Sequence, residues 1–338
     1  MRTLRLVISP LSTTVFRYKL EHIHNHREIC LQLQVQHCRA EVINHLPRST
    51  PSLQIYRAPR NPNSITAHHI TTQYHTMSLN PSNKPVLAVI GVGPGIGEAV
   101  SRHFAARDFT VALIARTETK LQQIQSAIND AHGAHTARYY VTDVRDEQQV
   151  TATFAAIKAE LGPVHVLIYN AGSRRLRPRT ILETPSDEFE SFVRINMFGA
   201  FYAAKCVLPD MLAADAGTII FTGATGSVRG SPGLGGFSPG KFGLRALSQV
   251  ITREFQSKGV HAAHVLVDGP VQSDIIGGFV KSRWEREGET EKLAQMERYL
   301  MQPKDLAEIY WFLYKQPRST WTQELDVRAE RESMFSKL

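Results

Sequence analysis

The chain has 338 residues, of which 42% are hydrophobic and 21% charged, a balance typical of a globular protein with ample material for a core. No apolar run approaches the ~18 residues that span a bilayer, so the sequence excludes a membrane-spanning protein. The net charge of +8 is concentrated in residues 1–76, which hold nine Lys or Arg against three Glu. The rest of the chain is close to neutral, and nucleic-acid binding is not expected.

Residues 1–76 differ in composition from the rest of the chain. They contain no aspartate, are rich in arginine and histidine, and end in a stretch of Pro, Asn, Thr and Ser without a sustained apolar period. We therefore expect a basic, disordered extension in front of one folded domain over residues 77–338. The extension is either a mitochondrial presequence or translated sequence upstream of a true start at Met77.

Metal and redox signals in the sequence are weak. The alternation of His22, His24 and His26 would bring three imidazoles to one face of a strand, but no further ligand is identifiable, and no metal site is predicted. The three cysteines form neither an even disulfide framework nor a paired zinc motif, which favours a reducing compartment. We expect a cytoplasmic protein, or a mitochondrial one if residues 1–76 are a presequence.

The folded part opens with a strand, a glycine turn and a helix. The apolar run Val86–Ile90 is typical of a parallel strand buried on both faces, and the segment after the turn carries Ile96, Val100 and Phe104 at helical spacing. Between strand and helix lie Gly91, Gly93, Gly95 and Gly97. Glycines let the backbone approach a pyrophosphate closely, and a helix N-terminus offers unpaired N–H groups, so this segment predicts a dinucleotide-binding loop.

The alternation of strand and helix continues through the chain. Further strands are predicted at residues 111–114, 139–141, 164–169, 218–221, 264–267 and 321–327. Amphipathic helices are predicted between them, the longest over residues 187–212 and 238–257. Repeated β-α units of this length predict an α/β fold with a doubly wound, Rossmann-type parallel sheet in a single domain.

Four motifs stand in the order that a known family shows. They are the loop Ile90–Gly97, the pair Asp143-Val144, the run Tyr169-Asn170-Ala171-Gly172 and a Phe-x-x-x-Lys pair ending at Lys241. From about Lys84 onward, the chain resembles the short-chain dehydrogenase/reductase family. The resemblance implies a small-molecule substrate and a homodimer or homotetramer. It also implies that a nicotinamide cofactor is bound by Gly91, Gly95, Ile96, Gly97, Asp143, Val144, Asn170, Ala171, Gly172 and Lys241.

The choice between NADP and NAD depends on the residue that follows the second strand. An acidic residue there would accept hydrogen bonds from the ribose hydroxyls of NAD and repel the extra phosphate of NADP. The chain instead has Ala115-Arg116, and a guanidinium can bind a 2′-phosphate through two hydrogen bonds. Arg116 therefore favours NADP over NAD, although the second basic residue that NADP-using relatives often carry in the glycine loop is absent.

The family's catalytic group is only half present. Asn196 and Lys241 match the family's asparagine and lysine, of which the lysine binds the nicotinamide ribose and lowers the pKa of a catalytic tyrosine. Phe237 stands at the tyrosine position, and the family's ungapped spacing puts Ala224 at the position of the substrate-orienting serine. Loss of a general acid typically costs ~10²–10⁴-fold in rate. The nearby hydroxyls that could substitute are Thr225, Ser227 and Ser238.

The C-terminal part also departs from the family. In the segment 268–273, Asp268 replaces the usual proline, while Gly269 and Ser273 keep the family spacing. The resemblance implies that Val271 and Ser273 contribute to the cofactor site. Residues 275–302 mix bulky apolar side chains with many charges, and we expect them to form a helical lid over the substrate.

Two classes of function follow from these observations. The first is an NADP-dependent oxidoreductase with a remodelled proton donor, acting on a carbonyl, an alcohol or an activated double bond. The second is a catalytically silent NADP-binding sensor or scaffold. A dehydratase or isomerase on the same fold is a weaker third. Asn196, Lys241 and the whole glycine loop are retained, which supports cofactor binding in both of the first two classes, and of these we favour the oxidoreductase.

Overall fold

The computed structural model describes residues 84–172 and 179–331. The predicted extension over residues 1–76, the start at Met77 and the His22–His26 alternation lie outside the described residues. Within the described ranges, no helix is both long and apolar enough to cross a bilayer.

The described ranges contain alternating strands and helices. The strands are β1 (Val86–Ile90), β2 (Thr110–Ala115), β3 (Ala137–Val141), β4 (Val164–Tyr169), β5 (Gly217–Thr222), β6 (Val260–Val267) and β7 (Glu324–Val327). The α-helices are α1 (Ile96–Ala105), α2 (Glu118–His132), α3 (Glu147–Leu161), α4 (Ser186–Val193), α5 (Gly199–Ala213), α6 (Phe237–Phe255), α7 (Asp274–Glu287), α8 (Thr290–Ala294) and α9 (Pro303–Lys315). Each predicted strand is present, with ends within four residues of the prediction.

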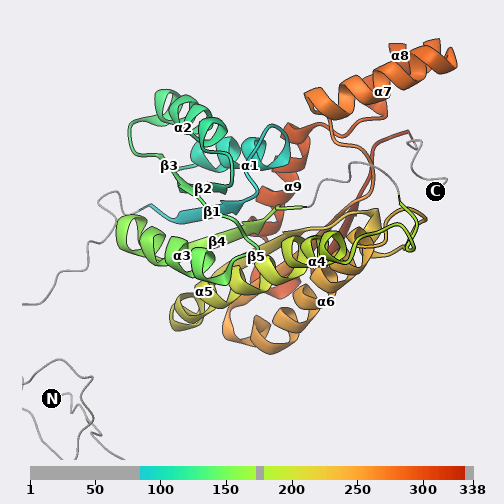
Figure 1. Cartoon of the computed structure of the whole chain (residues 1–338). Coiled ribbons are helices and arrows are strands. Elements are labelled where there is room, and N and C mark those ends of the chain that lie inside the picture. The colour runs from blue at the N-terminus through green and yellow to red at the C-terminus, as the bar shows by residue number, and fades with distance from the viewer. Residues whose placement is uncertain (1–83, 173–178, 332–338) are drawn as a thin grey trace, which may run out of the picture. The chain divides into compact units, whose positions relative to one another are not determined.

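The strands form one parallel sheet in the order β3-β2-β1-β4-β5-β6-β7. The chain builds outward from β1 to β3 and then crosses back, so that β4 pairs with the other side of β1 (Figure 1). This arrangement confirms the predicted Rossmann-type α/β fold. The reversal between β1 and β4 matters for function, because sheets of this kind bind ligands beyond the carboxyl ends of the strands at that point.

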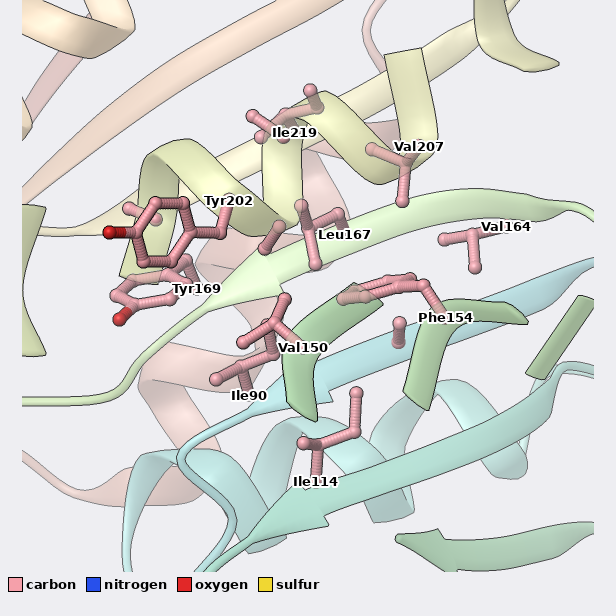
Figure 2. Close-up of a cluster of buried hydrophobic side chains, with 14 of the residues drawn as sticks. Ile90, Ile114, Val150, Phe154, Val164, Leu167, Tyr169, Tyr202, Val207 and Ile219 are labelled. Atoms are coloured by element: carbon pink, nitrogen blue, oxygen red, sulfur yellow. The ribbon is translucent and has the colours of Figure 1, made fainter. Parts of the chain in front are cut away.

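Successive side chains of the buried strands supply two apolar layers. On one face, Ile90 and Leu167 pack with Phe154 of α3 and Val207 of α5 (Figure 2). The opposite layer joins the sheet to α1, α2 and α9 and includes Leu87, Val100, Leu121 and Tyr310. Because both faces are covered, strands such as β1 are buried at every position, which explains their continuous apolar sequence.

The helix predicted over residues 187–212 is interrupted. A single π-helical turn, Arg194–Phe198, joins α4 to α5. The hydroxyl of Tyr169, at the end of β4, donates a hydrogen bond of 2.5 Å to the carbonyl of Ile195 in this turn. Gly199 leaves room for the contact, since a Cβ there would overlap the tyrosine hydroxyl. One continuous helix was predicted here, and the π turn, which is a rare, single-turn feature of helices, was not foreseen.

Strand β7 is fastened to its neighbours through buried polar groups. Glu324 accepts two hydrogen bonds of 2.6 and 2.7 Å from Arg245 of α6 and lies 3.1 Å from Nδ1 of His264 in β6. Nε2 of His264 lies 3.2 Å from the hydroxyl of Ser227. In the tautomer that satisfies both contacts, Nδ1 donates to Glu324 and Nε2 accepts from Ser227. Burial lowers the pKa of His264 to about 4, so the ring is neutral at pH 7.

Helices α7 and α8 belong to a segment with an apolar cluster of its own. Val280, Trp284 and Leu300 are buried there, and the Trp284 ring meets Tyr299 edge to face at 5.2 Å between centroids. The segment returns to the sheet at Met301, which forms backbone hydrogen bonds with Pro270 and Gln272. In Figure 1, α7 and α8 stand apart from the helices that cover the sheet. Helical structure is therefore present over residues 275–302, and the covering role of this segment stays a prediction.

The buried His264 makes stability depend on pH. Its pKa is lower in the folded chain than in the unfolded one, so its contribution is complete above pH 6.5 and is lost as pH falls toward 4. The two pKa values correspond to a loss of roughly 3 kcal/mol across that window. We expect the free energy of unfolding, measured by urea denaturation between pH 7 and 4.5, to fall less steeply in His264→Gln than in the unaltered chain.

His132→Gln is the matched control for this measurement, because His132 is exposed at the end of α2. That variant should keep the slope of the unaltered chain. The charged groups that face His264 are Glu324, Arg245 and Lys241, and all three remain in both variants. A His264→Gln protein with an unchanged slope would show that His264 is not the titrating group.

Candidate functional site

The glycine loop after β1 lies against the end of β4. Gly91 has a φ of 89°, and a Cβ there would lie 2.6 Å from Cα of Ala171, so a larger residue would force the backbones apart. A Cβ on Gly97 would lie 2.6 Å from the Gly91 carbonyl oxygen. At Gly93 and Gly95, by contrast, a Cβ would meet nothing within 4 Å. The loop is therefore tightly packed at Gly91 and Gly97 and leaves space at Gly93 and Gly95, which is the arrangement that pyrophosphate binding requires.

The predicted motif Asn170-Ala171-Gly172 ties the end of β4 to this loop. The backbone N–H of Asn170 donates to the carbonyl of Ile90 at 2.8 Å, and its side-chain amide donates to the carbonyl of Gly91 at 3.0 Å. Ile96, the first residue of α1, packs against the core layer that joins the sheet to α1, α2 and α9. The shape of the loop is therefore set by neighbouring backbone, and its contact with a cofactor stays a prediction.

Arg116 and Asp143 lie at the carboxyl ends of the adjacent strands β2 and β3. Arg116 is exposed directly after β2. Asp143 accepts hydrogen bonds from Arg145 through Nε at 3.0 Å and Nη2 at 2.5 Å, and these bonds hold the pKa of the carboxyl below its usual range. Val144 between them is buried in the core. Arg145 was not predicted as a site residue from the sequence. Its position two residues after Asp143 is the pattern that could have indicated this ion pair.

Lys241 and Asn196 meet beside Gly172. Nζ of Lys241 and Oδ1 of Asn196 lie 3.8 and 3.7 Å from the point that a Cβ of Gly172 would occupy. Lys241 is buried, its Nζ donates to the carbonyl of Thr222 at 2.8 Å, and burial lowers its pKa to about 8. The side-chain amide of Asn196 donates to the carbonyl of Phe192 at 2.8 Å. The π turn and α6 thus bring both predicted residues to the end of β4.

Phe237 and Ala224 carry no transferable proton at the positions where the family has hydroxyls. Phe237 begins α6 one turn before Lys241, and its ring centroid lies 6.0 Å from the lysine Nζ. The ring packs on Gly226, where a Cβ would lie 2.8 Å from it. Ala224 is extended beyond β5, and its N–H donates to the Ser227 hydroxyl at 3.2 Å.

The three hydroxyls predicted as possible substitutes have different surroundings. Ser227 is wholly buried between Ala224 and His264. Ser238 is 4% exposed, and its hydroxyl has no hydrogen-bond partner among the described residues. Thr225 is partly exposed and donates a hydrogen bond to Oδ1 of Asp268. Of the three, Thr225 alone combines access from outside with a carboxylate partner.

The segment after β6 forms the base of α7. Val271 pairs with Met301 in an isolated parallel bridge, and Ser273 caps α7 by accepting a hydrogen bond of 3.2 Å from the backbone N–H of Ile276. The structure therefore gives Ser273 a capping contact that sequence reasoning did not foresee. Its predicted contact with a cofactor stays a prediction.

A cavity of about 550 Å³ lies beside the first turn of α6. Three segments line it: residues 179–181, residues 230–235 and the start of α6. Apolar side chains dominate the lining, and the buried Ser238 also belongs to it. Arg179 at its edge forms an ion pair of 2.6 Å with Glu188. The volume suits a small molecule.

Comparison with known proteins agrees with this geometry. The family described as short chain dehydrogenase matches residues 85–282. The chain is 28% identical to carbonyl reductase family member 4 of Xenopus laevis over 235 residues, which cover 70% of this chain and 93% of that protein.

Solved structures give the same result. A short-chain dehydrogenase from Rhodopseudomonas palustris is 33% identical, with a TM-score of 0.59 and coverage of 72% of this chain and 98% of that one. A short chain oxidoreductase from Pseudomonas aeruginosa, described as containing an atypical catalytic center, is 25% identical, with a TM-score of 0.64 and coverage of 72% and 96%. The chain belongs to the short-chain dehydrogenase family and is an NAD(P)-dependent oxidoreductase of that type.

Proposed function

We propose that this protein transfers hydride between NADP(H) and a small carbonyl compound, alcohol or activated alkene, with a proton donor other than tyrosine. The observation that carries the proposal is the buried Lys241 beside Asn196 and Gly172, next to an intact glycine cradle and in front of Phe237. A chain that no longer used a nicotinamide would gain nothing from a buried lysine, whose desolvation is costly.

The residues that would hold the cofactor run along the carboxyl ends of β1 to β4. The cradle Gly91–Gly97 suits the pyrophosphate, and Lys241 suits the nicotinamide ribose. Arg116 and Arg145 supply two guanidinium groups where we expect the adenosine ribose of such a cofactor, and Asp143 is already paired with Arg145. Bound there, the cofactor supplies or accepts the hydride. This charge balance supports NADP over NAD.

The lysine and the asparagine have separate tasks in this proposal. A pKa of about 8 leaves Lys241 mostly protonated at pH 7, so its Nζ can donate to a ribose hydroxyl while it keeps its bond to Thr222. Asn196 is fixed by its bond to Phe192 and borders the same space. Nζ of Lys241 lies 6.0 Å from the centroid of the Phe237 ring, and we assign the proton transfer to a group other than these two.

A catalytically silent NADP-binding sensor or scaffold is the alternative. Its support is the joint absence of hydroxyls at Ala224 and Phe237. The Pseudomonas aeruginosa relative favours the oxidoreductase, because it is described as an oxidoreductase although its catalytic center is described as atypical. A departure from the usual residues is thus compatible with that activity in a relative that shares 25% of its residues with this chain.

A homodimer or homotetramer and a cytoplasmic location also belong to the proposal. Large apolar side chains are 40 to 48% exposed along the helices α5 and α6 and the π turn before α5, namely Phe198, Phe201, Phe242 and Val250. Burial of these side chains against a second copy would remove apolar surface from water. The substrate is a small molecule, as for the family in general.

The cofactor preference can be tested at Arg116. We expect the unaltered chain to bind NADPH more tightly than NADH, and Arg116→Glu to reverse that order, because a carboxylate repels the 2′-phosphate and accepts ribose hydroxyls. Loss of charge-assisted hydrogen bonds of about 1.5–3 kcal/mol should weaken NADPH binding by roughly 10–100-fold. Cofactor fluorescence titration measures both affinities.

Arg253→Glu provides the control for this titration, since Arg253 is exposed on α6 and carries the same charge change. Its affinities should match those of the unaltered chain. Equal affinities of the unaltered chain for NADPH and NADH would contradict the assignment of Arg116.

The second test separates the enzyme from the silent binding protein. The unaltered chain, Lys241→Ala and the double variant Phe237→Tyr with Ala224→Ser are assayed with NADP(H) and a panel of ethyl acetoacetate, cyclohexanone, 2-cyclohexen-1-one and cyclohexanol. We expect turnover in the unaltered chain, its loss in Lys241→Ala, and a change in pH dependence in the double variant. Phe312→Tyr is the control, because it adds a hydroxyl to an exposed phenylalanine of α9 that does not line the cavity.

A different set of results would support the silent binding protein. Tight NADPH binding without turnover in the unaltered chain, followed by a gain of about 10²-fold or more over background in the double variant, would identify a silent binding protein whose general acid can be restored.

A further inference from the structure

Four hydroxyl side chains surround the end of β5 and the start of α6, where the family's proton donor is missing. Thr222, Ser227 and Ser238 are buried, with exposed fractions of 6, 0 and 4%. Thr222 is also engaged with the Tyr310 hydroxyl at 2.6 Å, and Ser227 with His264 at 3.2 Å. Thr225 is the one of the four that is partly exposed. Thr225 therefore has the most access to solvent among the four, while Ser238 borders the cavity beside α6.

The partner of Thr225 is a carboxylate. Its hydroxyl donates to Oδ1 of Asp268, while Oδ2 of Asp268 lies 2.8 Å from Nη2 of Arg328. The Asp268 side chain is only 14% exposed, so its carboxylate lies largely out of contact with water. Asp268 occupies the place of a proline in the family pattern. The chain has thus gained a proton acceptor close to the point where it lost two hydroxyls.

The turn that carries Thr225 is held rigidly. The Ser227 N–H donates to the Ala224 carbonyl at 2.7 Å, and the Ala224 N–H donates to the Ser227 hydroxyl. Behind Ser227, His264 and Glu324 continue the network to Arg245. The ring of Phe237 packs against Gly226 of the same turn. These contacts fix the direction of the Thr225 side chain, which a proton-transfer group requires.

Thr225 and Asp268 also lie at the functional end of the sheet. They follow β5 and β6, which are neighbours, at their carboxyl ends. Thr222, three residues before Thr225, provides the carbonyl that binds Lys241 Nζ. Ligands of doubly wound sheets bind beyond this edge. The pair is therefore on the same side as the lysine that would hold the nicotinamide ribose.

We propose that Thr225 exchanges the proton with the substrate oxygen in place of the missing tyrosine, and that Asp268 stores that proton behind it. The inference rests on the proposed oxidoreductase function. In alcohol oxidation, the C–H hydride leaves to the oxidised nicotinamide and C–O becomes C=O. The substrate O–H proton passes to Thr225 Oγ1, while the proton of Thr225 moves along the existing hydrogen bond to Asp268 Oδ1 and then to water. Carbonyl reduction runs the same transfers backward.

The test uses three variants of the full chain. Thr225→Val removes the hydroxyl at nearly constant shape, Thr225→Ser restores it, and Asp268→Asn keeps an acceptor for Thr225 but cannot take up a proton. Asp326→Asn is the matched control, because Asp326 also pairs with Arg328, at 2.9 Å, but belongs to β7. Each protein is assayed for kcat against pH with the panel compound that the unaltered chain turns over, for NADPH affinity and for its unfolding midpoint.

We expect Thr225→Val and Asp268→Asn each to lower kcat by about 10²-fold or more, the range for loss of a general acid or base. NADPH affinity should stay within twofold, Thr225→Ser should recover most of kcat, and Asp326→Asn should resemble the unaltered chain. Asp268→Asn should also remove one limb of the pH profile. Arg328, which faces Asp268 from the segment after β7, remains present in all these proteins.

Two results would overturn the proposal. Unchanged kcat in Thr225→Val would show that another group carries the proton. Parallel losses of kcat, NADPH affinity and unfolding midpoint in Thr225→Val and Asp268→Asn, without rescue by Thr225→Ser, would show that the pair only clamps β5 to β6. Absence of turnover in the unaltered chain itself is a different result, because it would refute the oxidoreductase function and the proton pair together.

Discussion

The close approach of two strand ends sets the geometry of the whole site. Only a glycine at position 91 lets the turn after β1 lie against the backbone of Ala171 after β4. Asn170 then closes the joint with hydrogen bonds to Ile90 and Gly91. Because β4 is fixed there, its terminal Tyr169 reaches the carbonyl of Ile195 in the π turn and so positions Asn196 beside Lys241. The glycine loop and the pair formed by Asn196 and Lys241 are thus parts of one packed unit.

The glycine loop and the residues at the ends of β5 and β6 tolerate substitution to different degrees. The cradle depends on backbone contacts without space for side chains, so it changes little without losing the fold. At the ends of β5 and β6, by contrast, the ring of Phe237 packs on Gly226, and Asp268 forms an ion pair with Arg328. Chemistry can be rewritten there while the cofactor site stays intact.

The sequence predicted most of the fold, because buried parallel strands are continuous apolar runs and the intervening helices are amphipathic. It also identified Lys241, Asn196 and the glycine loop from local motifs. It did not reveal the π turn, the Asp143–Arg145 pair or the contact between Thr225 and Asp268. The last joins residues from different strands, and no local period or motif encodes which side chains meet across a sheet edge. The start at Met77 and the extension before it remain predictions.

The separate apolar cluster of residues 276–300 has a consequence for how this protein can diversify. Val280, Trp284 and Leu300 pack with one another and belong to neither core layer of the sheet. Mutations within that cluster can therefore reshape the segment around α7 and α8 with little cost to the stability of the nucleotide-binding body. Substitutions in this cluster would thus alter the predicted lid without disturbing the two core layers that carry the glycine loop.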